Sequence, residues 1–198
     1  AKEAFGTDSL EGLHIAVQGL GKVGKHLVEH LHQEGARVTV TDINEDNIRA
    51  VAERFPVKPV PPEGIYDVEC DIFSPNALGA VLNDNTIPRL RCKAIAGAAN
   101  NQLAIPEVHG PMLTDRGITY APDYVINAGG LIQVADELQG FNRERAFDKT
   151  ARIYFLLQTI FELAKHERLH TYEAADLMVE RRLAKLGRIR SNYIKREK

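Results

Sequence analysis

Residues 13–42 read LHIAVQGLGKVGKHLVEHLHQEGARVTVTD, and this stretch decides the fold. The apolar run at 13–18 is typical of a buried strand, and residues 22–34 predict an amphipathic helix that ends at Gly35. Residues 37–41 predict a second strand. The sequence GLGKVG, which has the pattern GxGxxG, separates the first strand from the helix. The stretch therefore predicts a strand–helix–strand unit whose first turn is built from glycine.

The same alternation continues as far as about residue 130. A second helix is expected at 45–55, before the proline-rich connection PVKPVPPEG. Later strands are expected at 68–73, 92–96 and 117–121. Alternating strands and helices imply parallel strands joined by right-handed crossovers, which predicts a doubly wound, mostly parallel α/β fold of the Rossmann type.

Two helical runs, at 146–167 and 171–190, end the chain without further strand signals. They have too few residues for an independent domain. We therefore expect residues 1–146 to form the Rossmann-type domain and residues 147–198 to form a C-terminal helical appendage of the same domain.

Each glycine of GLGKVG has a mechanical role in the expected turn. Gly19 makes the tight turn out of the strand, Gly21 lets the backbone approach a pyrophosphate, and Gly24 lets the helix pack close to the sheet. The helix then directs free N–H groups at the phosphates. Asp42 ends the second strand, where a carboxylate binds the adenosine ribose and repels a 2′-phosphate. The sequence predicts NAD rather than NADP; the alternative is a glycine turn that binds another nucleotide-like ligand, or nothing.

Asparagine and small residues follow the three later strands, at the edge where open α/β sheets bind ligands. The segments are SPNALG, GAANNQL with Asn100, and PDYVINAGGL with Asn127. An asparagine offers both a donor and an acceptor, which suits a carboxamide or a substrate amino acid. The alternative is that these residues only form turns. We expect the loops to converge beside a nicotinamide.

Charge and composition narrow the function further. The net charge of -2 over 198 residues argues against nucleic acid, although residues 181–198 are basic. We expect that basic segment to be a solvated or subunit-facing helix, the alternative being a phosphate-binding tail. The sequence has no apolar run of membrane-spanning length and no signal peptide, so we expect a cytoplasmic protein.

The cysteines, the histidine pair and the adjacent acids of the sequence are each expected to have a structural role and not a functional one. Cys70 and Cys92 are expected to be packed thiols. His26 and His30 have metal-ligand spacing but lack a third ligand, so no metal site is expected. Asp136 and Glu137 point apart if they lie on a helix, and we expect surface or capping groups.

GLGKVG with Asp42, DIFSPNALG, IAGAANNQL and APDYVINAGGL, in this order, resemble the NAD-binding domain of the glutamate/leucine/phenylalanine/valine dehydrogenase family. The resemblance covers nearly the whole chain and is strongest to the leucine and tryptophan dehydrogenase branch. It implies reversible oxidative deamination of an apolar L-amino acid to a 2-oxo acid and ammonia, with NAD as cofactor. The implied cofactor site consists of Gly19, Leu20, Gly21, Lys22, Val23, Gly24, Asp42, Ile43, Ala77, Ala99, Asn100 and Asn127. The implied substrate pocket consists of Asn127, Leu131 and Val134.

Members of this family also have an N-terminal domain with a substrate-binding Lys, a catalytic Lys and an Asp, and no matching segment occurs in this sequence. Imine hydrolysis needs a general base and a cation for the substrate carboxylate, and Lys22 is the only lysine near an expected ligand loop. We therefore expect no catalytic residue here, but a fragment that binds NAD(H), is inactive alone and meets the amino acid or 2-oxo acid together with the complementary domain. The alternative is a stand-alone NAD-binding sensor or interaction module. The resemblance implies that the helices from 147 on return toward the missing domain. We therefore expect some of their apolar surface, at Tyr154, Leu157 and Phe161, to be exposed and to favour a homo-oligomer.

Overall fold

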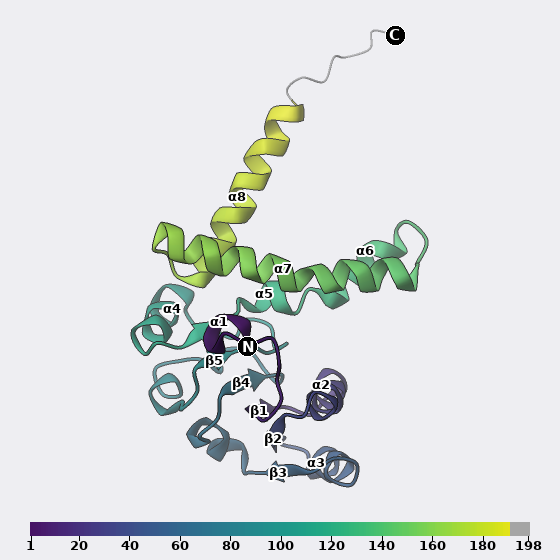
Figure 1. Cartoon of the computed structure of the whole chain (residues 1–198), viewed down its shortest axis with the longest axis vertical. Coiled ribbons are helices and arrows are strands. Elements are labelled where there is room, and N and C mark those ends of the chain that lie inside the picture. The colour runs from purple at the N-terminus through teal and green to yellow at the C-terminus, as the bar shows by residue number, and fades with distance from the viewer. Residues whose placement is uncertain (191–198) are drawn as a thin grey trace.

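Six parallel strands form the centre of the molecule, as seen in a computed structural model that describes residues 1–190 (Figure 1). Their order across the sheet is β3-β2-β1-β4-β5-β6. They are β1 (His14–Gln18), β2 (Arg37–Thr41), β3 (Val57–Pro59), β4 (Ile72–Pro75), β5 (Ala94–Ile95) and β6 (Thr119–Tyr120). The order reverses between β1 and β4, and ligands of doubly wound sheets bind at such a reversal. The predicted Rossmann-type α/β fold is confirmed.

Helices cover both faces of this sheet because each strand alternates its side chains between two apolar clusters. Ile15 and Val17 of β1 pack with Val28 and Leu31 of α2, whereas Ala16 belongs to the cluster on the other face. The first face carries α1 (Lys2–Phe5), α2 (Lys22–Gln33) and α3 (Glu45–Ala52). The second face carries the 3₁₀ helices η1 (Pro62–Asp67) and η2 (Ile87–Arg89) and the helix α4 (Pro106–Asp115).

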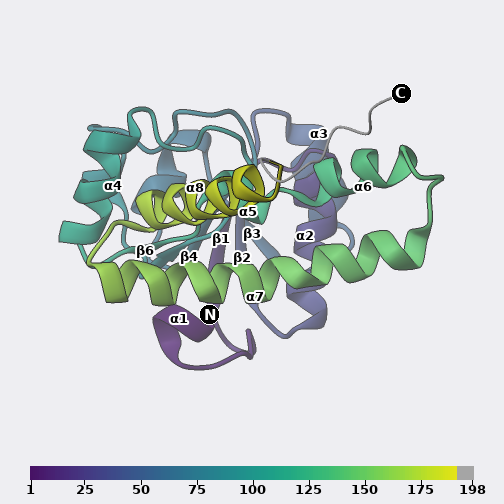
Figure 2. The same ribbon diagram turned by 90° about the horizontal axis from the view of Figure 1, so that it is seen from above.

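The C-terminal part is helical, as the two helical runs predict. Its elements are α5 (Asp123–Ile126), α6 (Gly129–Glu137), α7 (Arg143–Glu167) and α8 (Thr171–Arg190). Helix α6 lies along the first half of α7 (Figures 1 and 2), and α8 projects away from the sheet (Figure 1). Ile160 and Ala164 of α7 join Ala174 and Ala175 of α8 in a third apolar cluster. The proposed division at residue 146 falls inside α7, and it remains a proposal.

Two expectations for this helical part can be compared with the described residues. Residues 181–186 are exposed, in agreement with a solvated helix. Of the rest of the expected basic segment, 187–190 complete α8 and 191–198 lie outside the described residues. Of the three apolar residues expected to be exposed, Tyr154 is 45% exposed, Leu157 is half-buried and Phe161 is buried. The expectation was therefore wrong for Phe161, which packs in the interior. Within residues 1–190, no helix is both long and apolar enough to cross a membrane.

The strand boundaries differ most from the sequence-based expectation beyond residue 55. Strand β3 lies inside the connection PVKPVPPEG and pairs only with β2. Pro59 is tolerated there because an edge strand leaves one side of its backbone without a sheet partner. The strand expected at 68–73 is shifted, since regular pairing of β4 starts at Ile72 and only Glu69 makes an isolated bridge to Arg91 before it.

Candidate functional site

The glycine turn brings α2 into direct contact with the end of β1. Gly19 has φ +95°, and a Cβ on Gly24 would lie 2.0 Å from the carbonyl oxygen of Gly19. Gly21 is different, because a Cβ there would meet nothing within 4 Å. Gly21 is also the N-cap of α2, and no side chain caps the helix there, so its first N–H groups have no side-chain partner from the cap residue. Two glycines therefore serve packing, while Gly21 leaves room for a ligand beside a helix N-terminus.

Asp42 connects the glycine turn to the start of the next helix. Its Oδ2 accepts a hydrogen bond from the backbone N–H of Leu20 at 2.6 Å, and its Oδ1 accepts one from the N–H of Asn44 at 2.7 Å. The side chain of Asn44 in turn caps α3. Each carboxylate oxygen keeps a further lone pair, so Asp42 is held in place and can still accept hydrogen bonds from a ribose.

A cavity of about 430 Å³ opens at this edge of the sheet. Gly19, Gly21, Asp42, Ile43 and Ala77, all expected from the sequence, line it. Asn76 and Leu78, from the expected loop SPNALG, also line it. Its other lining residues were missed by sequence reasoning: Gln18, Thr41, Pro62, Glu63, Tyr66 and Val81. Open backbone, a fixed carboxylate and apolar walls fit the adenosine and pyrophosphate of a dinucleotide.

Not every expected cofactor residue offers its side chain to this cavity. Leu20 is fully buried, so only its backbone N–H reaches the site, through Asp42. Lys22 and Val23 are exposed on the first turn of α2. Ala99 is 4% exposed, and its N–H donates to the carbonyl of Pro75.

The asparagines that were expected beside a nicotinamide meet each other. The side-chain amide of Asn127 donates a hydrogen bond to the Oδ1 of Asn100. The loops approach closely enough that a Cβ on Gly97 would lie 2.2 Å from the carbonyl oxygen of Pro75, and one on Gly79 would lie 2.6 Å from that of Asn100. The expected convergence of the segments that follow β4, β5 and β6 is therefore present, although the ligand that they face stays a prediction.

The expected substrate-pocket residues on α6 are not enclosed. The exposed fractions of Leu131 and Val134 are 73% and 58%. Neither residue lines the cavity beside Asp42. Their role in a substrate pocket therefore stays a prediction.

Asp136, on the opposite side of α6, was expected to be a surface or capping group, and the surface alternative is wrong. Its side chain is fully buried and accepts hydrogen bonds from the Arg145 guanidinium, from Lys149 and from the N–H of Asn142, which caps α7. Hydrogen bonds from Arg145, then from the Asn142 backbone and Lys149, lower the pKa of Asp136 below its ordinary value. The carboxylate thus fixes α6 against α7, which determines the face that α6 presents outward.

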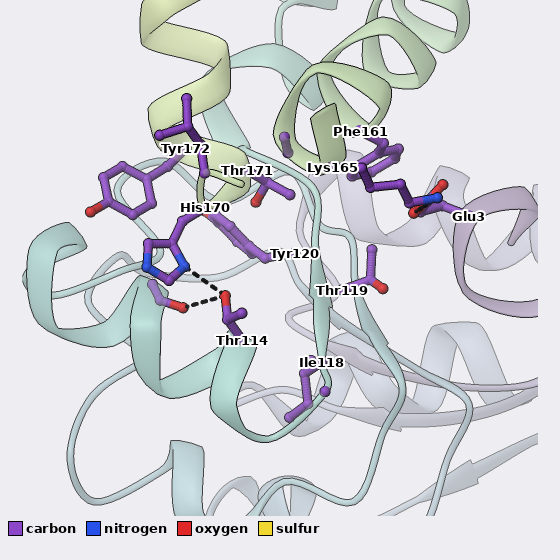
Figure 3. A pocket seen from close by; sticks show the side chains of 14 residues that line it. Glu3, Thr114, Ile118, Thr119, Tyr120, Phe161, Lys165, His170, Thr171 and Tyr172 are labelled. Atoms are coloured by element: carbon purple, nitrogen blue, oxygen red, sulfur yellow. Dashed lines mark hydrogen bonds and ion pairs between the residues drawn. The ribbon is translucent and has the colours of Figure 1, made fainter. Parts of the chain in front are cut away.

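A second cavity, of about 280 Å³, lies against β6 between α4 and the start of α8 (Figure 3). Its charged groups already have partners: Lys165 pairs with Glu3 at 2.7 Å, and the His170 ring is 2.8 Å from the hydroxyl of Thr114. None of its lining residues comes from the glycine turn or from the loops with Asn100 and Asn127. We therefore take the cavity beside Asp42 as the candidate site.

The cysteines show no sign of chemistry. Both are free and partly buried, and burial raises the pKa of the Cys70 thiol to about 12 and that of Cys92 to about 11. A thiol with a raised pKa is a poor nucleophile at neutral pH. Among the described residues, no three His, Cys, Asp or Glu side chains are grouped to hold a metal ion.

Comparison with known proteins identifies the family. The family model described as "Glutamate/Leucine/Phenylalanine/Valine dehydrogenase" matches residues 40–190. The chain belongs to this family. The resemblance read from GLGKVG, IAGAANNQL and APDYVINAGGL is therefore confirmed.

Individual relatives within the family are similar over almost the whole chain. Leucine dehydrogenase of Thermoactinomyces intermedius is 56% identical over 194 residues, which cover 98% of this chain and 53% of the relative. Phenylalanine dehydrogenase of the same organism is 48% identical, over 96% of this chain and 52% of the relative. The solved structure of L-tryptophan dehydrogenase from Nostoc punctiforme superposes with a TM-score of 0.92 at 44% identity, covering 94% of this chain and 56% of that one. The chain spans about half the length of the curated relatives that it matches.

Proposed function

We propose that this chain is the NAD-binding part of an L-amino-acid dehydrogenase that converts an apolar amino acid to a 2-oxo acid and ammonia. The observation that carries the proposal is the cavity in which open backbone at Gly21 and the fixed carboxylate of Asp42 lie together. NAD supplies the hydride acceptor when it is bound. The glycine turn would hold its pyrophosphate, Asp42 its adenosine ribose, and Asn100 with Asn127 the nicotinamide side.

The preference for NAD over NADP follows from charge. Asp42 and Glu63 both line the cavity, and no Lys or Arg is among the lining residues of the described chain. A 2′-phosphate placed beside Asp42 would meet a carboxylate without a compensating cation. The proposal therefore includes discrimination against the phosphorylated cofactor.

Titration with NADH and NADPH, followed by cofactor fluorescence, tests this proposal. Wild-type protein is expected to bind NADH and to reject NADPH, and Asp42→Ala should weaken NADH binding about tenfold or more, because charged hydrogen bonds to the ribose are lost. Asp46→Ala is the matched control, since this exposed acid lies four residues away and is outside the cavity. Absence of saturable NADH binding by the wild type would overturn the proposal.

The amino-acid specificity is proposed as apolar because the relatives act, by their names, on leucine, phenylalanine and tryptophan. We propose further that this chain alone does not turn over amino acids. A chimera in which it replaces the matched 194 residues of the Thermoactinomyces intermedius enzyme should show leucine-dependent NADH formation. A chimera that folds and binds NADH but has no activity would favour the alternative, a sensor or interaction module.

A further inference from the structure

A hydroxyl and an amide meet at one wall of the cofactor cavity. The Nε2 of Gln18, the last residue of β1, donates a hydrogen bond to the hydroxyl of Tyr66 at 2.8 Å. Both residues line the 430 Å³ cavity, although Tyr66 is only 7% exposed. Since the hydroxyl oxygen accepts from Gln18, its own proton is free to be donated elsewhere. Within the described residues, the Tyr66 hydroxyl makes no hydrogen bond other than the one it accepts from Gln18.

The Tyr66 ring is held on two sides. Its centroid lies 5.9 Å from that of Phe73, and the guanidinium of Arg89 lies 5.3 Å from the ring centroid. Arg89 is itself fixed by hydrogen bonds to both carboxylate oxygens of Asp67 and to the backbone carbonyl of Glu63. The hydroxyl therefore has a defined position before any ligand binds.

The partner amide is incompletely satisfied. The Oε1 of Gln18 is buried and has no hydrogen-bond partner. An unpaired buried acceptor is costly, and a leucine or methionine at this position would avoid that cost. The amide makes one bond only, and that bond determines where the Tyr66 hydroxyl points. This arrangement is what a positioning role requires.

The neighbours in the cavity indicate which half of the cofactor the hydroxyl faces. Asp42, the expected ribose ligand, is followed along the cavity wall by Ile43, which is 90% exposed, and the facing loop contributes Leu78, which is 80% exposed. Exposed apolar side chains beside a ribose ligand suit the flat faces of a purine. An adenine has ring nitrogens that accept hydrogen bonds, and Tyr66 offers the donor.

We propose that the Tyr66 hydroxyl, positioned by Gln18, is a recognition element for the adenosine half of the dinucleotide. This inference rests on the proposed NAD-binding function. It assigns a binding role to Tyr66 and a positioning role to Gln18, neither of which lies in the glycine turn.

The test uses three ligands: NADH, ADP-ribose, which has the adenosine half, and reduced nicotinamide mononucleotide, which lacks it. Tyr66→Phe should weaken the binding of NADH and of ADP-ribose by a similar factor, about fivefold, because one hydrogen bond is lost. Binding of the mononucleotide should not change. Gln18→Met should produce a smaller loss with the same ligand pattern, since the hydroxyl remains but is no longer oriented.

Tyr124→Phe is the matched control, because its hydroxyl bonds Asp176 outside this cavity. Circular dichroism and thermal unfolding check that all variants are folded. Unchanged ADP-ribose affinity in a folded Tyr66→Phe would overturn the inference, and so would an equal loss for the mononucleotide. If the wild type binds neither NADH nor ADP-ribose, the proposed function itself fails, so the two failures are distinguishable.

Discussion

The glycine-turn edge of the sheet and the α6–α7 hairpin are built in opposite ways. At the sheet edge, close backbone packing fixes every element: Gly24 touches Gly19, and Asp42 is bonded to two backbone N–H groups. The hairpin depends on one buried carboxylate, that of Asp136, and its outer face exposes Leu131 and Val134. Where backbone packs against backbone, as at Gly24, an added Cβ has no room, whereas a surface oriented by one ionic cluster should lose its arrangement when that cluster is removed.

The sheet edge should show the largest effect when a single methyl group is added. Gly24→Ala would place a Cβ 2.0 Å from the Gly19 carbonyl oxygen, in backbone that cannot move without shifting β1 or α2. We expect it to lower the free energy of unfolding by about 3 kcal/mol and to abolish NADH binding. Urea unfolding and cofactor fluorescence measure the two effects.

Gly21→Ala provides the matched control for this substitution. A Cβ at Gly21 meets nothing within 4 Å, so the stability of the protein should change by less than about 1 kcal/mol. NADH affinity should nevertheless fall, because the new methyl group takes the space proposed for the pyrophosphate. Equal losses of stability in both variants would show that the two glycines do not have separate roles.

Removal of the Asp136 charge should destabilise the α6–α7 hairpin. Asp136→Asn leaves Arg145 and Lys149 beside a neutral amide, and we expect the Tm to fall by on the order of 5–10 °C. Binding of NADH should stay near the wild-type value, because Asp136 is outside the cofactor cavity. Asp148→Asn, which neutralises an exposed acid on α7, is the control and should change the Tm little.

The same variant predicts a pH dependence. The pKa of Asp136 is lower in the folded protein than its ordinary value of 3.8. The carboxylate therefore contributes its full stabilisation above the unfolded pKa and loses it as the pH falls toward the depressed folded pKa. The Tm difference between wild type and Asp136→Asn should be equal at pH 7 and pH 5.5 and should narrow below about pH 4. A difference that already narrows between pH 7 and pH 5.5 would contradict this assignment.

Local sequence signals predicted the glycine-turn edge of the sheet well because the residues that interact there are close together in the sequence. The strand at 14–18, the helix at 22–33 and the strand at 37–41 follow directly from apolar periodicity and glycine, and Asp42 follows from its position at the end of a strand. The long helices α7 and α8 are equally clear from their periodicity. These elements supplied the fold class and most of the glycine-turn site.

Residues whose roles depend on distant partners could not be found in this way. Tyr66 meets Gln18 across 48 positions, and nothing in the sequence around PEGIYD indicates that contact. From the sequence alone, Asp136 is expected to be an exposed acid on a helix. Only the turn between α6 and α7 brings Arg145 beside it. Strand β3 was not predicted because its sequence contains proline, which is tolerated in a strand only at the edge of a sheet.

Leu131→Gln is expected to have the smallest effect on the stability and NADH affinity of this chain. It is also the most specific test of the proposed role of α6 in the substrate pocket. Leu131 is 73% exposed and Gln is a good helix former, so we expect the Tm to change by less than about 2 °C and NADH affinity to stay constant. In the active chimera, the same substitution should raise the KM for L-leucine several-fold, because an amide would replace an apolar wall of the proposed substrate pocket. Phe155→Gln, at a position 68% exposed on α7, is the control for an exposed apolar residue outside that pocket. If both substitutions change the KM equally, the outer face of the hairpin acts as a whole; if only Leu131→Gln does, α6 carries the specificity.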